Sequence, residues 1–317
     1  MARKSGHSAA VTAGLAFGLA IGLGLGTYVL SPNLSGGSGQ QRFTLEKERN
    51  EARERADIQA AQASSADHFV DTLAASVLPG SLKERPILLI RMAGSSDEDA
   101  KALGEDLKRA GAINSGTISL SEKLASQDGA DGLKNIVSTV LPAGAQLSTD
   151  KLDPGTHAGE VLGSALTLNP QDAKEQATRD ERNLVLNALR EGGYLSYEEG
   201  TILPAQAVVV LGGDSDGAGA DFVVKNQVSF VEALDARGSG VVLAGRIHMA
   251  ADSGAIGKLR ANKKAASQVS SVDSIDRSWG RIATILALKE QLSGGAGAYG
   301  AAGNADATAP APSEDKQ

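Results

Sequence analysis

Residues 9–30 form an uninterrupted run without a single charged side chain. A helix of this length, at about 1.5 Å per residue, spans the roughly 30 Å hydrocarbon core of a bilayer. Arg3 and Lys4 come before the run, and the next charged residue is Arg42. The positive-inside rule therefore predicts one transmembrane helix, with residues 1–8 in the cytoplasm and the rest of the chain outside. A cleaved signal peptide is the alternative, although its apolar region is usually shorter.

Glycine recurs at every fourth position of this run, at Gly14, Gly18, Gly22 and Gly26. Residues four apart lie on the same face of a helix, so these glycines form a groove along which a second helix can approach closely. The spacing predicts self-association of the chain within the membrane. Glycine is also generally frequent in membrane helices, which leaves a purely compositional explanation open.

A flexible joint and then a coiled-coil stalk are predicted after the membrane helix. Residues 31–41 are rich in Ser, Gly and Gln, as flexible linkers are. Residues 42–78 contain no Pro or Gly, and apolar residues occupy eight of ten positions there that are spaced by alternating steps of four and three, with Arg49 and Gln59 as the exceptions. This heptad pattern is typical of a helix that pairs with other helices, so we expect a homo-oligomer joined through the membrane helix and the stalk. The apolar heptad positions are Leu45, Ala52, Ala56, Ala63, Ala66, Val70, Leu73 and Val77.

Residues 81–292 alternate short apolar runs with amphipathic helical patterns and are expected to form an extracytoplasmic domain. Strands that are apolar throughout and separated by helices predict an α/β fold, in which a mainly parallel sheet has helices on both faces. Beyond this domain the composition changes to Gly, Ala and Pro, so we expect residues 293–317 to be a disordered tail. The expected strands lie at 86–91, 113–120, 207–212, 241–247 and 267–273.

Composition and missing motifs exclude several classes of function. The chain has no cysteine, which rules out a disulfide framework, a thiolate metal cage and an iron–sulfur cluster. Its net charge of −7 argues against a nucleic-acid partner, because such proteins normally present a basic surface. The sequence also lacks phosphate-binding loops, paired-histidine metal motifs and nucleophile elbows. We therefore expect a protein that is not an enzyme.

Candidate metal ligands lie where the predicted parallel strands end, because ligands of such sheets gather at the carboxyl ends of strands. Met92 follows the strand at 86–91, and His248 and Met249 follow the strand at 241–247. Thioether sulfur suits copper(I), and imidazole is also a common ligand of copper. These three residues are thus a candidate copper(I) site. The alternative is structural, because methionine commonly fills gaps in apolar cores.

Six stretches share both their residues and their order with a known family. They are LPAGAQLST (141–149), HAGEVLGSAL (157–166), AVVVLGG (207–213), SSVDSID (270–276), GRIATILALKEQ (280–291) and GAYG (297–300). Together they resemble the actinobacterial copper transporter MctB family. The resemblance implies a cell-envelope protein of mycolic-acid bacteria that takes part in copper efflux and copper tolerance and is described as channel-like. It supplies no catalytic or metal-ligand residues for this sequence.

Three functions are compatible with these features. The first is a component of copper efflux and copper homeostasis, anchored by one helix and carrying copper(I) as the transported or bound ion. The second is a non-catalytic scaffold of the envelope that recruits a protein partner. The third is a metal- or small-ligand-binding module that uses the crevice at the strand ends. Whether the chain resides in the inner or the outer membrane stays open.

Overall fold

The computed structural model describes residues 38–238 and 240–311. The chain divides into two compact units, residues 1–64 and residues 65–317. The predicted membrane helix at 9–30, with its glycines Gly14, Gly18, Gly22 and Gly26, lies outside the described residues. Within the described ranges, none of the helices combines the length and the apolar character that a membrane span requires.

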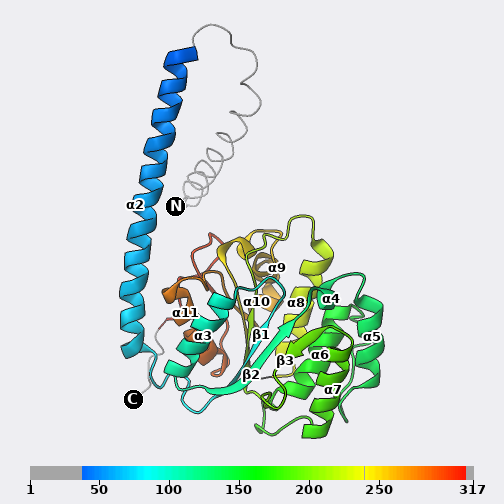
Figure 1. Ribbon diagram of the computed structural model, residues 1–317. Helices are drawn as coiled ribbons and strands as arrows, with labels where there is room; N and C mark the ends of the chain where they lie inside the picture. The colour runs from blue at the N-terminus through cyan, green and yellow to red at the C-terminus, as the bar shows by residue number, and fades with distance from the viewer. Residues whose placement is uncertain (1–37, 239, 312–317) are drawn as a thin grey trace, which may run out of the picture. The chain divides into compact units, whose positions relative to one another are not determined.

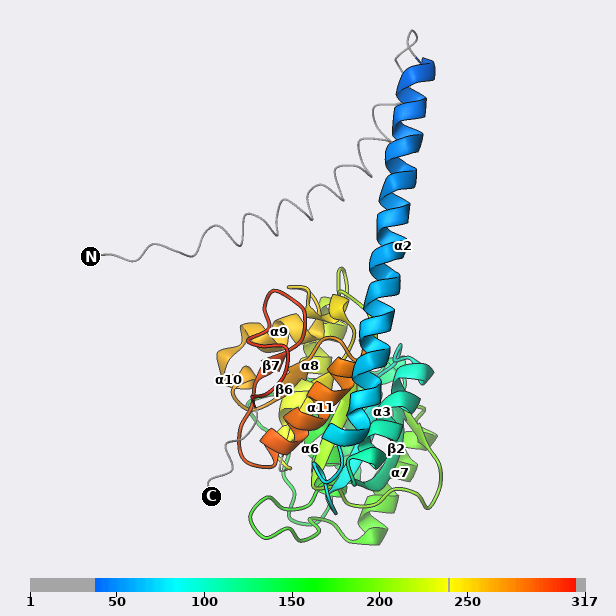
Figure 2. The same cartoon turned by 90° about the vertical axis from the view of Figure 1, so that its left-hand side faces the viewer.

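One continuous helix, α2, runs from Ser38 to Val77 (Figure 1 and Figure 2). It therefore begins before the end of the joint expected at 31–41 and covers nearly all of the expected stalk at 42–78. The chain leaves the helix at Pro79 and Gly80, and Gly80 has a φ of 82°, a left-handed conformation that favours glycine. Several predicted heptad positions are exposed, so the pairing of this helix stays a prediction.

The second unit is built on a seven-stranded sheet with the order β3-β2-β1-β4-β5-β6-β7. Within the described ranges, each pair of neighbouring strands is parallel except β2 with β3. This arrangement confirms the predicted α/β fold with a mainly parallel sheet. The strands are β1 (Pro86–Arg91), β2 (Ile113–Leu120), β3 (Leu195–Tyr197), β4 (Ala207–Leu211), β5 (Val241–Ala244), β6 (Ser270–Val272) and β7 (Ala298–Tyr299).

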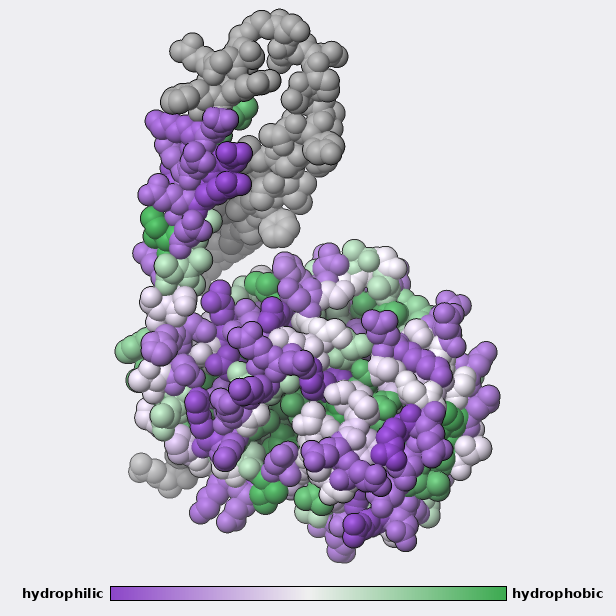
Figure 3. Space-filling model, in the orientation of Figure 1, coloured by the Kyte–Doolittle hydropathy of each residue, from purple (hydrophilic) through white to green (hydrophobic). Residues whose placement is uncertain are grey.

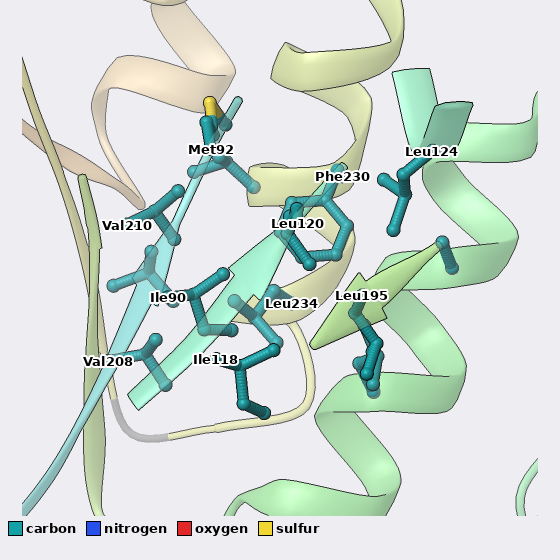
Figure 4. Close-up of a cluster of buried hydrophobic side chains, with 14 of the residues drawn as sticks. Ile90, Met92, Ile118, Leu120, Leu124, Leu195, Val208, Val210, Phe230 and Leu234 are labelled. Atoms are coloured by element: carbon teal, nitrogen blue, oxygen red, sulfur yellow. The ribbon is translucent and has the colours of Figure 1, made fainter. Parts of the chain in front are cut away.

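Side chains alternate between the two faces of the sheet, and each face has its own buried apolar cluster. Leu88 and Ile90 of β1 belong to the cluster shown in part in Figure 4, whereas Ile87 and Leu89 belong to the other. In Figure 3, the visible face of the second unit carries mainly hydrophilic side chains, with hydrophobic ones scattered among them. The apolar strand residues therefore lie inside, between the sheet and its helices.

Helices cover both clusters. The helices over the first cluster include α6 (Pro154–Leu166) and α8 (Asp221–Asp235), and α3 (Asp97–Arg109) and α11 (Ser278–Gln291) cover the second. The remaining helical segments of the second unit are α4 (Glu122–Ala125), α5 (Ala130–Thr139), α7 (Arg179–Glu191), η1 (Ile247–Ala250), α9 (Ala255–Ala261) and α10 (Lys263–Ala266).

The expectation of a disordered tail over 293–317 is wrong for the part that the structure describes. Strand β7 pairs with β6 at the edge of the sheet. Ala301 donates its backbone N–H to Asp273 Oδ1 at 2.8 Å, and Arg260 Nη2 donates to the Tyr299 carbonyl at 2.7 Å. The apolar side chains of the segment are mostly small alanines, but buried charged groups bind its backbone. Composition alone does not reveal contacts of this kind.

Asp235, at the end of α8, is half-buried, and burial raises its pKa from 3.8 to about 7. Between these two values the folded protein keeps a proton that the unfolded chain releases, so stability falls as pH rises, by at most about 1.4 kcal/mol per pH unit. We expect Asp235→Asn to remove this decline and to be more stable than the wild type above pH 7. Urea denaturation at pH 5, 6, 7 and 8 measures the difference. Exposed Asp252 offers a control in Asp252→Asn, and parallel pH profiles for Asp235→Asn and the wild type would contradict the expectation.

Candidate functional site

A cavity of about 400 Å³ lies at the carboxyl ends of β1, β2 and β4. The chain continues from β1 to β2 on one side and later returns to place β4 on the other side of β1. Ligands of open α/β sheets bind at such a reversal of strand order. Apolar side chains form most of the wall, and Figure 4 shows four of them, Met92, Leu120, Leu124 and Phe230.

The structure brings Met92 and Met249 to this one cavity. Met92 directly follows β1, donates its backbone N–H to the Leu211 carbonyl at 2.8 Å, and has a buried side chain. Met249 is also buried, and its sulfur packs against Gly212 and Gly245. A Cβ atom at either glycine would overlap that sulfur, so the two glycines make the space that the thioether occupies.

His248 does not join the two methionines. Its side chain is 64% exposed, and its Nδ1 lies 2.9 Å from Asp214 Oδ1. The sequence prediction extended the strand to residue 247, but β5 ends at Ala244 and His248 lies in the 3₁₀ segment η1. Successive side chains of a 3₁₀ helix point about 120° apart, so Met249 turns inward while His248 faces solvent. The expected three-residue site is therefore reduced to two residues in the cavity.

The charge around the cavity is negative. Glu122 and Asp214 are the ionisable residues among the described lining residues, and both are carboxylates. Two arginines near the strand ends are already paired. Arg91 donates to Asp97 at 2.6 Å, and Arg246 donates two hydrogen bonds to Asp99, at 2.8 and 3.1 Å. The charged side chains of the described lining are thus both negative, and Arg246, although paired with Asp99, also interacts electrostatically with Asp214.

A cluster of oxygen, nitrogen or thiolate ligands is not found at this site. In the part of the chain that the structure describes, no three His, Cys, Asp or Glu side chains gather as a metal-binding group. Met92 and Met249 bring two thioether groups to the lining of the cavity, a type of ligand that suits a soft ion.

Sequence reasoning missed the helical part of the wall. Leu124 comes from α4, and Val223, Val224 and Phe230 come from α8. The rule of strand ends identifies only residues that follow strands. The sequence shows an apolar face of α8 in the helical spacing of Val224, Val228, Val231 and Leu234. This spacing does not show which turn of the helix borders a cavity.

Comparison with known proteins agrees with the resemblance in the sequence. Residues 5–310 match the family model described as Copper transport outer membrane protein, MctB. Proteins named Copper transporter MctB from Mycobacterium bovis and Mycobacterium tuberculosis are each 35% identical over 240 residues, which cover 75% of this chain and 76% of the relative. The protein of that name from Mycobacterium leprae is 33% identical over 238 residues, covering 73% and 75%. The chain therefore belongs to the MctB family of copper transport outer membrane proteins.

Proposed function

We propose that this protein takes part in copper efflux and copper homeostasis, and that its cavity holds copper(I) during that process. The family description and the names of the relatives support a role in copper transport. The observation that carries the site is the presence of Met92 and Met249, both buried, in the wall of one cavity.

The chemistry of the cavity suits copper(I). Thioether sulfur is a soft ligand, and the chain has no thiol that would compete for a soft ion. The carboxylates of Glu122 and Asp214 attract a cation to the cavity. Two thioethers bind more weakly than a thiolate cage would, and a transport protein has to release its ion.

His248 has the position of a ligand that captures copper outside the cavity. Its Nδ1 is held by Asp214, and Asp214 itself lines the cavity. Metal-binding histidines are commonly oriented by a carboxylate in this way. In the proposal, copper(I) first binds at the exposed imidazole and then passes to Met92 and Met249.

The proposal places the protein in a membrane as a homo-oligomer. The uncharged run at 9–30 would span the bilayer once, with the N-terminus in the cytoplasm, and Gly14, Gly18, Gly22 and Gly26 would form the contact between copies. The long helix α2 supports association outside the membrane, because Phe69, Leu73 and Val77 recur on one of its faces and are exposed. A scaffold of the envelope that does not bind copper is the second candidate, and the same exposed face favours it.

A titration of the full-length protein in lipid nanodiscs with copper(I) tests the site. With bicinchoninate as competing chelator and oxygen excluded, we expect one copper(I) per chain. Met92→Leu and Met249→Leu should each weaken binding at least about tenfold, a loss of about 1.4 kcal/mol. Leucine conserves the volume of methionine, so the fold should be retained.

Leu234→Met is the matched control, because it exchanges the same two residue types within the same buried cluster but outside the cavity lining. Its copper affinity should equal that of the wild type. Unchanged affinity in the double variant Met92→Leu/Met249→Leu would overturn the proposed site. The absence of copper binding by the wild type would favour the scaffold.

A further inference from the structure

We infer that the cavity at the strand ends also binds a small, mainly apolar organic molecule with a positively charged group. This inference goes beyond copper transport and does not depend on it, because it rests on the size, the apolar wall and the charge of the cavity.

The size of the cavity fits an organic molecule. Its volume of about 400 Å³ falls within the range of about 300–1,000 Å³ that is typical of small-molecule sites. A single metal ion occupies a small fraction of that space. The position of the cavity, where the strand order reverses beside β1, is also where α/β folds bind their small ligands.

The wall of the cavity selects an apolar body. Side chains from strand ends and from helices α4 and α8 contribute to it, and most of them are apolar. Phe230 and Leu124 are buried, and Val223 is half-buried. Burying an apolar surface against such a wall stabilises the complex by about 25 cal/mol for each Å² removed from water.

The charged groups select a cation. Glu122 and Asp214 line the cavity, and the basic residue next to Glu122 is directed elsewhere. Lys123 Nζ donates to the Gly192 carbonyl at 2.8 Å and lies 4.5 Å from the centre of the Tyr194 ring. The imidazole that pairs with Asp214 belongs to the exposed His248, which is not among the residues that line the cavity. Arg246 also interacts electrostatically with Asp214, but its guanidinium is held by Asp99 and lies outside the lining.

Anionic ligands such as nucleotides do not fit this site. In nucleotide-binding α/β folds, glycines after a strand let the backbone approach a phosphate. Here Gly212 and Gly245 instead make room for the sulfur of Met249. The first turn of α3, which follows β1, carries Asp97, Glu98 and Asp99, and the arginines that reach it, Arg91 and Arg246, are already paired with Asp97 and Asp99.

Photolabelling with a matched pair of probes tests the inference. The probes are 4-(aminomethyl)benzophenone, a cation, and benzophenone-4-carboxylate, an anion with the same aromatic body. Benzophenone inserts readily into C–H bonds next to sulfur, so a probe in the cavity should label Met92 and Met249. The full-length protein in nanodiscs is irradiated without copper and in the presence of a chelator. Mass spectrometry then reads the tryptic peptides 92–101 and 247–258, and labelling of the other tryptic peptides measures the background.

We expect the cationic probe to label both peptides saturably, and the anionic probe to label them at least about tenfold less at equal concentration. Val223→Trp fills the cavity from its half-buried edge and should abolish the labelling, whereas Phe222→Trp, the exposed neighbour outside the lining, should not. Glu122→Lys, at an exposed position, should remove the preference between the probes, because the lining then carries one positive and one negative side chain, and Asp128→Lys should leave the preference unchanged.

Three results would overturn the inference. They are labelling at background level, equal labelling by the two probes, and unchanged labelling in Val223→Trp together with an unchanged preference in Glu122→Lys. Because copper is absent throughout, none of these results depends on the proposed copper site. Failure of the copper titration would likewise leave the labelling result untouched.

Discussion

Replacing Asp273 with alanine should lower the free energy of unfolding by about 3–5 kcal/mol, because the substitution leaves the buried charge of Arg260 without its partner. The Asp273 side chain is 0% exposed and the Arg260 side chain 4% exposed, and Arg260 Nη1 lies 2.8 Å from Asp273 Oδ2. Asp273 also accepts hydrogen bonds from the Ser274 hydroxyl and the Ala301 backbone N–H, both at 2.8 Å. Urea denaturation, followed through the fluorescence of the single tryptophan, Trp279, measures the loss.

Asp276→Ala is the matched control for this prediction. Asp276 lies 3.5 Å from Arg277 in a pair whose side chains are 37% and 41% exposed, so its removal should cost less than about 1 kcal/mol. Replacing both buried partners, in Arg260→Met/Asp273→Leu, should be less damaging than Asp273→Ala because no unpaired charge is left. Equal stabilities of Asp273→Ala and Asp276→Ala would show that the buried pair does not stabilise the fold.

Asp273→Ala should also loosen the attachment of residues 298–307 to the rest of the domain. Asp273 and Arg260 hold Tyr299 and Ala301 through their backbone atoms, and Arg260 Nη1 also donates to Asn304 at 2.7 Å. Amide hydrogen exchange across residues 298–307 should therefore accelerate in Asp273→Ala beyond the change that the loss of global stability produces. Unchanged relative protection of this segment would contradict its dependence on the ion pair.

The sheet could be predicted from the sequence where its strands are long and apolar. The runs at 86–90 and 207–211 are apolar because both faces of β1 and β4 are covered by helices. The short strands β3 and β7, of three and two residues, carry no such signal. Arg260 donates to the Tyr299 carbonyl of β7, and Asp273 accepts from the Ala301 N–H just after β7, across 39 and 28 positions of the sequence. A local pattern does not contain that information.

The candidate site was predictable in part, for a related reason. Met92 follows a strand whose end was predicted correctly, so its place at the carboxyl edge followed from the fold class. His248 depended on the exact end of β5, and a difference of three residues turned its side chain into solvent. Leu124 and Phe230 reach the cavity from helices that pack against the sheet. The positions of Leu124 and Phe230 in the wall depend on how these helices pack against the sheet, and residue spacing in the sequence does not predict that packing.

Asp106→Ala should be the second strongly destabilising substitution, with a loss of about 3 kcal/mol. The Asp106 side chain is 2% exposed and accepts hydrogen bonds at 2.8 Å from Arg109 of its own helix α3 and from Arg281 of α11. Arg109 is 42% exposed and is able to turn toward water after the substitution. Arg281 is 12% exposed and keeps only Asp71 at 3.8 Å, a carboxylate that is itself 38% exposed, so the cost comes mainly from this residue.

Asp71 of α2 pairs with the same two arginines, but its removal should cost much less stability than the removal of Asp106. It lies 3.2 Å from Arg109 and 3.8 Å from Arg281, but its side chain is 38% exposed and both arginines keep Asp106 when it is removed. Asp71→Ala should therefore cost less than about 1 kcal/mol in urea denaturation while it accelerates hydrogen exchange in residues 65–77. Asp106→Ala should instead lower protection in α3 and α11 together. Equal losses of stability in Asp71→Ala and Asp106→Ala would contradict the prediction. They would show that the different burial of the two carboxylates does not decide how much each one stabilises the fold.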